Sequence, residues 1–228
     1  VSVFLWFLVD YLYVMGRTYT APLGFDIRHT YSIVISSLSE RSPDYIPKEK
    51  RERPDGVHLL TALDRIRTYP GVESACLTDG GMPYYMGSRN LVWRIDTLQV
   101  PCRYAFVTPE FFDVFRIYDK DGKTASLKRA IEDNNSIVIS AAVETMNPGL
   151  SLLGQKAYRG NVTDEIEETI RGISVPIRRH EYTKAEPNVY RALRLSRMEE
   201  GYYEGMIDAV RLCVRVRPDV DNADFPAR

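Results

Sequence analysis

The sequence contains few of the residues that build common catalytic and metal sites. Among its 228 residues there are three cysteines and three histidines. Cys76, Cys102 and Cys213 lie far apart and form no C-x-x-C motif, so neither a thiol redox motif nor a zinc knuckle is predicted. The histidines are also too widely spaced for a helical zinc-binding pair; they are His29, His58 and His180.

The sequence also lacks the short motifs that bind phosphate or carry a catalytic nucleophile. No G-x-x-x-x-G-K-[ST] loop occurs, and Gly80-Gly81 is not part of one. No G-x-S-x-G nucleophile elbow occurs either. The formal net charge is −1 and the basic residues are spread along the chain, which argues against a nucleic-acid partner. We therefore predict no catalytic residue, no cofactor and no metal ion, and we expect that the protein is not an enzyme.

Two acidic segments match cation sites only in part. Asp119-Lys120-Asp121-Gly122 begins like a calcium loop, but the third acidic ligand and the closing glutamate are missing, so we predict a β-turn. The second segment follows Asn161-Val162-Thr163, and we interpret it as a solvated loop, with a weak cation site or a contact to a basic partner as the alternative. Its acidic residues are Asp164, Glu165, Glu167 and Glu168.

The first residues are strongly apolar. Residues 1–9 contain one polar residue, Ser2, and Asp10 then precedes a second apolar run. The stretch is shorter than the ~20 residues of a membrane-spanning helix, and it lacks the basic start and the cleavage site of a signal peptide. We predict the outer end of a transmembrane helix, with Trp6, Tyr11 and Tyr13 near the lipid headgroups. An amphipathic core helix is the alternative.

The remaining sequence alternates between strand and helix patterns, and 44% of all residues are hydrophobic, enough for one large domain or two small ones. Residues 30–36 and 72–78 are predicted strands, and residues 57–69 between them follow helical spacing, which gives a β-α-β unit. Gly80-Gly81-Met82-Pro83 then opens a different region. Further predicted strands are residues 91–95, 100–107, 136–140, 171–177, 189–194 and 206–217, with a short helix at 141–146.

The segment Phe106–Ile117 carries the densest aromatic cluster. Thr108 before Pro109 is typical of a helix start, with the hydroxyl at the N-cap. A short helical turn with several large apolar side chains is stable only when they are buried. We therefore expect at least two of Phe111, Phe112 and Phe115 to be deeply buried.

The order of these residues resembles a known family. A strand followed by T-P-E-F-F-D-V-F is similar to the motif in the periplasmic core domain of MacB-like ABC transporter permeases, which belong to the FtsX-like permease superfamily. A Gly-Arg-rich loop and a phenylalanine-glycine pair of that family are replaced here by Tyr118–Lys123 and by Met146-Asn147-Pro148-Gly149. Further similar segments follow in the family's order over residues 57–217; they are Leu63–Glu73 (L…I…PGV), Ile137–Ser140 (VVIS), Leu153–Lys156 (iGk), Ile170–Ile173 (vvGV) and Pro187–Tyr190 (P-x-v-y).

The resemblance implies an α+β fold with two lobes on the extracytoplasmic side of the membrane. Residues 1–22 would be the end of a transmembrane helix and a linker, 23–82 the first part of a β-α-β lobe, 83–205 a mostly β inserted subdomain, and 206–228 the returning strand of the first lobe.

The resemblance further implies a permease subunit in the cell inner membrane, with this domain in the periplasm. A separate cytoplasmic ABC ATPase would hydrolyse ATP, and the domain would couple this to export or mechanical work. Expected partners are that ATPase, a second permease copy, the membrane, and a periplasmic or outer-membrane protein. The alternative is a ligand-binding or sensor domain of a membrane receptor. A hydrolase is disfavoured because no set of catalytic residues is found in the sequence.

Overall fold

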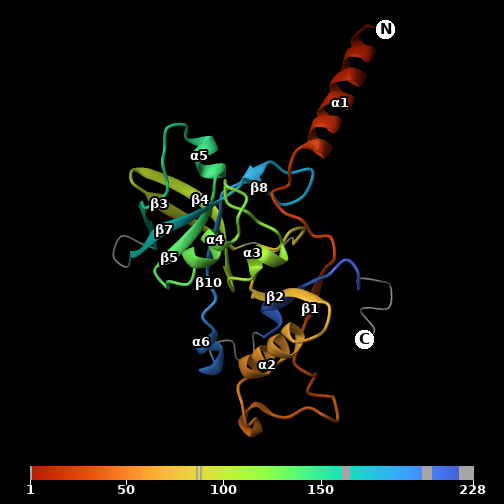
Figure 1. The fold of residues 1–228 in the computed structure, drawn as a ribbon, viewed down its shortest axis with the longest axis vertical. Coiled ribbons are helices and arrows are strands. Elements are labelled where there is room, and N and C mark those ends of the chain that lie inside the picture. The colour runs from red at the N-terminus through yellow and green to blue at the C-terminus, as the bar shows by residue number, and fades with distance from the viewer. Residues whose placement is uncertain (1, 86, 88, 161–164, 202–206, 221–228) are drawn as a thin grey trace.

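A nine-stranded sheet in the order β1-β11-β2-β4-β10-β5-β7-β6-β3 connects both halves of the chain in the computed structural model (Figure 1). The structure describes residues 2–85, 87, 89–160, 165–201 and 207–220. The strands are β1 (Thr30–Val34), β2 (Val72–Thr78), β3 (Arg89–Ile95), β4 (Leu98–Val107), β5 (Ser136–Ser140), β6 (Lys156–Arg159), β7 (Ile166–Ser174), β8 (Ile177–Arg178), β9 (Ala185–Glu186), β10 (Asn188–Ala192) and β11 (Arg211–Val216). The helices are α1 (Ser2–Thr20), α2 (Asp55–Arg67), α3 (Phe111–Val114), α4 (Ala125–Ala130), α5 (Ala142–Met146) and α6 (Leu195–Glu199), with single 3₁₀ turns η1 (Lys48–Lys50) and η2 (Ile207–Ala209).

The predicted β-α-β unit forms one end of this sheet. Strand β11 lies between β1 and β2 and is antiparallel to both, so β1 and β2 run in the same direction. Helix α2 connects them and buries Leu59 and Leu63 in one hydrophobic cluster with Leu77 of β2 and Leu212 of β11. The late strand thus pairs with residues 72–78, as the sequence predicts. The division of the chain into lobes at residues 82 and 206 stays a prediction.

The other six strands close on themselves. Strand β3 pairs with β6 at one side and with β4 at the other, so β4, β10, β5, β7, β6 and β3 form a closed ring. Successive side chains along each strand point to opposite faces, so both faces of the ring carry buried residues. Trp93, Ile137 and Ile139 belong to one buried cluster, whereas Val138, between the two isoleucines, belongs to the cluster that includes α3.

The aromatic segment is core, as predicted. Phe111 and Phe112 are 0% exposed and Phe115 is 4% exposed. The ring of Phe111 lies 4.8 Å from that of Phe115 and 5.4 Å from that of Tyr190. The predicted N-cap is wrong, however, because α3 begins at Phe111 and the Thr108 hydroxyl accepts a hydrogen bond from the Leu77 N–H of β2 at 3.1 Å instead.

Several predicted boundaries shift for local reasons. The expected strand 206–217 is shorter, because η2 precedes β11; residue 206 lies outside the described part of the chain. The expected strand 171–177 is the end of β7, and Val175-Pro176 separates it from β8 because proline cannot donate to a ladder. The helices α4 and α6 and the strands β6 and β9 were not predicted, since each is only two to six residues long.

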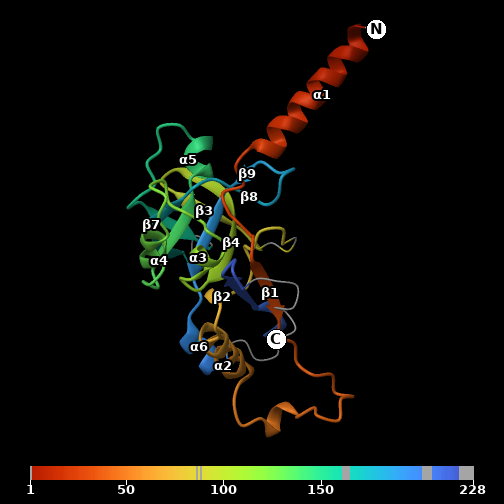
Figure 2. The same cartoon turned by 45° about the vertical axis from the view of Figure 1, so that its right-hand side comes forward.

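Helix α1 projects away from the body in both views (Figures 1 and 2). Residues 3–14 are exposed, so the alternative of a core helix is wrong. Within the described ranges, no helix combines the length and the apolar character that crossing a membrane requires.

Replacing Phe112 by alanine should lower the free energy of unfolding by about 3–5 kcal/mol, because a fully buried aromatic ring leaves a cavity. Chemical denaturation measures this change. Phe4→Ala is the matched control, since Phe4 is 80% exposed. An unchanged midpoint for Phe112→Ala would contradict the buried cluster.

Candidate functional site

Helix α1 is fixed to the body by one buried arginine of β8. The Arg178 guanidinium donates hydrogen bonds to the carbonyls of Thr18 and Ala21, both at 3.0 Å, where α1 ends. It also donates to the carbonyl of Thr183 at 2.7 Å and to that of Glu181, which belong to the loop between β8 and β9. The last carbonyls of a helix have no partner inside the helix, so Arg178 supplies donors where they are needed. The side chain thereby joins the helix end to the β8–β9 hairpin.

The chain after α1 passes very close to the same hairpin. The Arg178 N–H donates to the carbonyl of Leu23 at 3.0 Å. Gly24 has φ +85°, and a Cβ there would lie 2.3 Å from the carbonyl oxygen of Pro176. Only glycine fits this approach, which keeps the connecting segment in contact with β8.

A second buried arginine fixes the next part of the connecting segment to β11. Arg215 is 1% exposed, and it donates to the carbonyl of Val114 at 2.6 Å, to that of Arg28 at 2.8 Å and to that of Asp26. Burial lowers the pKa of this guanidinium, and the positive charge of Arg116 adds to the shift. Residues 18–28 are therefore tied to the β8–β9 hairpin through Arg178 and to the β-α-β unit through Arg215.

The carboxyl group of Asp26 makes the stability of this segment depend on pH. Its carboxylate accepts hydrogen bonds from the Arg28 side chain at 2.9–3.2 Å and from the Arg28 N–H at 2.8 Å. These bonds, led by the side-chain contact, lower the pKa of Asp26 to about 2, with burial acting in the opposite direction.

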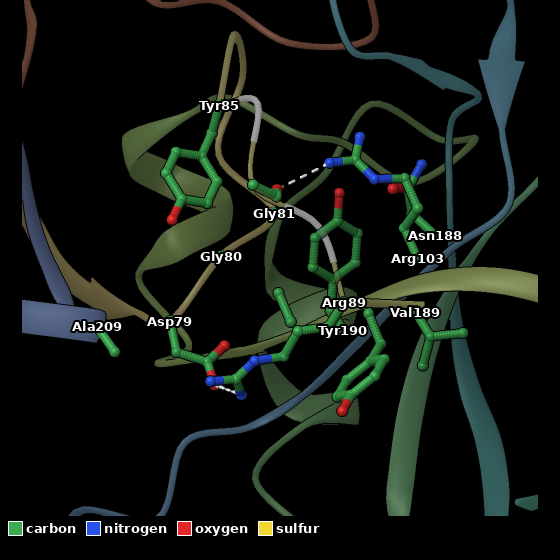
Figure 3. A pocket seen from close by; sticks show the side chains of 13 residues that line it. Asp79, Gly80, Gly81, Tyr85, Arg89, Arg103, Asn188, Val189, Tyr190 and Ala209 are labelled. Carbon is green, nitrogen blue, oxygen red and sulfur yellow. Dashed lines mark hydrogen bonds and ion pairs between the residues drawn. The ribbon is translucent and has the colours of Figure 1, made fainter. Parts of the chain in front are cut away.

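The two ends of the sheet meet beside a small cavity of about 250 Å³ (Figure 3). Strands β2 and β4 share one register pair, Thr78 with Val107. Asp79 extends this contact, because its carboxylate accepts the Phe106 N–H at 2.7 Å and its own N–H donates to the Phe106 carbonyl at 3.1 Å. Arg89 donates to the other carboxylate oxygen at 2.5 Å.

Burial raises the pKa of Asp79, and the Phe106 and Arg89 donors oppose the shift. Both carboxylate oxygens are engaged, so this residue stabilises the contact between the strands.

The structure keeps the other candidate residues apart. The Asp119 carboxylate accepts the N–H groups of Asp121 and Lys123 at 2.9 and 2.8 Å, which is the turn predicted there. Gly81 has φ +70° and turns the chain out of β2, next to Ala105. In the described residues, no group of three or more histidine, cysteine or acidic side chains could hold a metal ion. The three cysteines are buried free thiols.

The interpretation of the acidic run as a solvated loop is wrong for its second half. Glu167 and Glu168 belong to β7, and Glu168 is 2% exposed because it shares a strand face with buried Ile170. Its carboxylate pairs with Arg191 at 2.5 Å and with Arg159 at 3.4 Å. Asp164 lies outside the described residues.

Sequence reasoning missed Arg178 and Arg215. For Arg215 a signal exists, because it lies between Val214 and Val216 in a predicted strand whose neighbours are buried on both faces. Arg178 is one of two adjacent arginines in a short irregular segment, and nothing in the sequence distinguishes it from Arg179.

Acid should weaken the connecting segment through Asp26. A carboxyl group whose pKa is lowered by folding stabilises the fold above its unfolded pKa, 3.8, and loses that contribution as the pH falls through about 2. Relative to Asp26→Asn, the unaltered protein should be more stable at pH 6 by up to about 1 kcal/mol, because Arg28 is exposed and solvent screens the pair. Denaturation from pH 6 to pH 2 measures the difference, which should shrink below pH 4. A constant difference would contradict the assignment.

Replacing Arg178 by alanine should loosen α1. Spin labels at Tyr11→Cys and Leu153→Cys, both at exposed positions and with the native thiols buried, report the distance from α1 to the body. We expect a broader distance distribution in Arg178→Ala, because several carbonyls lose their donor at once. Arg171→Ala is the control, since that side chain is 58% exposed and pairs with Asp133 rather than with α1 or the β8–β9 hairpin. An unchanged distribution would show that other contacts position α1.

Comparison with solved structures gives the same fold. The chain superposes with a TM-score of 0.50 on the periplasmic region of MacB from Actinobacillus actinomycetemcomitans, at 10% identity, over 92% of this chain and 85% of that one. A domain of a Porphyromonas gingivalis protein described as a permease also matches with a TM-score of 0.50, at 20% identity and over 71% of this chain; the match spans 62% of that structure's length. No family model matches the sequence, and the search of curated proteins gives no match. The α+β fold expected from the sequence is confirmed, and it is the fold of the periplasmic region of MacB.

Proposed function

We propose that this chain is the extracytoplasmic domain of an ABC transporter permease subunit. Three independent features support this. The fold is that of the MacB periplasmic region. The sequence segments similar to that family occur in the family's order. An apolar helix, exposed along residues 3–14, leads into the body.

The attachment of α1 is the observation that best supports the proposal, because it would let the domain respond to movement of the helix without catalysing a reaction. A helix that leads from a membrane must pass its movements to the folded body if the domain is to couple with events across that membrane. Arg178 joins the end of α1 to the β8–β9 hairpin, which is bound to β5 of the ring because the Ser140 hydroxyl donates to the Glu186 carbonyl at 3.0 Å. Arg215 joins the following residues to the β-α-β unit. A displacement of α1 would therefore reach the hairpin and the β-α-β unit through buried hydrogen-bond donors rather than through a free linker.

The proposed division of labour follows from this. A separate cytoplasmic ATPase would hydrolyse ATP, and the present domain would convert the resulting helix movement into export or mechanical work. The domain itself would not be an enzyme. A second permease copy and a periplasmic or outer-membrane protein are the proposed partners on this side of an inner membrane.

The location of the domain can be tested by chemical labelling in intact cells. Leu153 is 58% exposed in the loop before β6, so Leu153→Cys in the complete gene product should react with a membrane-impermeant maleimide before the cells are broken. The unaltered gene product is the control for any other reactive thiol, because the three cysteines of the present chain are buried and should stay unlabelled. Labelling that occurs only after lysis would place the domain in the cytoplasm and contradict the proposal.

A further inference from the structure

A second, larger cavity of about 530 Å³ lies where β10 leads into α6. Its volume is in the range of small-molecule sites. Phe106, Ile166 and Ala192 form apolar parts of the wall. The remaining wall is dominated by five arginines, which are Arg89, Arg159, Arg191, Arg194 and Arg197.

One buried carboxylate, Glu168, pairs with two of the arginines that line this cavity. Glu168 accepts a hydrogen bond from Nε of Arg191 at 2.7 Å. The Arg191 guanidinium also lies over the Phe106 ring, 4.7 Å from its centroid. Arg191 is thereby fixed from two sides and is not available as a mobile donor.

Two of the other arginines have donors to spare. The Arg159 Nε lies 3.4 Å from Oε2 of Glu168, but neither atom has a hydrogen-bond partner among the described residues. The side chain of Arg194 makes no hydrogen bond or ion pair with any described residue. Burial lowers the pKa of Arg191, and the nearby charges of Arg159 and Arg194 add to this shift, while Glu168 opposes it.

The charges around the cavity do not balance. Glu168 faces Arg191 and Arg159, and Asp79 pairs with Arg89. Leaving aside Arg197, which has a further interaction of its own, the four other guanidinium groups meet two carboxylates among the described residues, an excess of two positive charges. A multivalent anion compensates such an excess better than a single carboxylate does, and the planar guanidinium fork matches the oxygens of a phosphate.

We propose that this cavity binds a small organic phosphate, with the phosphate oxygens held by Arg159 and Arg194 and the organic part against Ile166 and Ala192. The phosphate contacts are inferred from the cavity residues alone, whereas the choice of a soluble molecule over a lipid headgroup rests on the proposed function. The source is a soluble molecule rather than a lipid headgroup, because α6 lies at the end of the body opposite to the one from which α1 projects (Figures 1 and 2).

Titration calorimetry of the chain with inorganic pyrophosphate tests the site. Arg194→Gln should weaken binding about tenfold, the effect of losing one charge-assisted contact. Arg159→Gln should act similarly, and Arg194→Gln remains decisive if loss of the Arg159 charge disturbs the fold around Glu168. The matched control is Arg171→Gln, which removes the same charge from β7 at a 58% exposed side chain that does not line the cavity. The control should bind within about twofold of the unaltered chain.

Each outcome decides between the site and its alternatives. No binding by the unaltered chain overturns the proposal, and so does an equal loss in Arg194→Gln and Arg171→Gln, which would mean unspecific attraction of anions. Vesicles of anionic phospholipid should not displace pyrophosphate. Displacement that requires Arg194 would overturn the assignment to a soluble molecule.

Discussion

The whole sheet depends on the short contact between β2 and β4. One register pair, Thr78 with Val107, joins the β-α-β unit to the six-stranded ring. Two side chains reinforce it, since Asp79 binds the Phe106 N–H and Thr108 accepts the Leu77 N–H. Both residues are buried, so their hydrogen bonds replace those that water would make. These two side chains therefore add to the single register pair and to the core around α3, which contains Cys76 and Cys213 together with Val138 and Tyr190.

The buried arginines extend the same principle to the N-terminal segment. Arg178 and Arg215 donate to backbone carbonyls rather than to carboxylates, so they organise irregular chain that has no ladder of its own. A buried charge is costly unless hydrogen bonds compensate it, and each guanidinium here has at least three acceptors. These arginines attach the end of α1 and the residues after it to the folded body.

Much of this fold could be predicted from periodicity and turn residues. Strands β2 and β5 and the burial of Phe111, Phe112 and Phe115 follow from local patterns that tertiary contacts reinforce. Glu168 and Arg178 could not be predicted, because their burial depends on partners far away in the sequence. The arginine-lined cavity was missed partly for the same reason, because Arg89 and Arg159 come from distant strands. A local signal exists in residues 191–197, where three arginines follow one another at a spacing of three with no acidic residue between them.

The closed ring of six strands has a consequence for how the domain can deform. In an open sheet, edge strands slide or peel at little cost, but a ring has no free edge, and shear within it would break ladder bonds on both sides of a strand. The ring therefore behaves as a stiff element, whereas the β2–β4 contact has one register pair. Deformation costs least where the fewest ladder bonds resist it, so bending of the domain would concentrate at that contact.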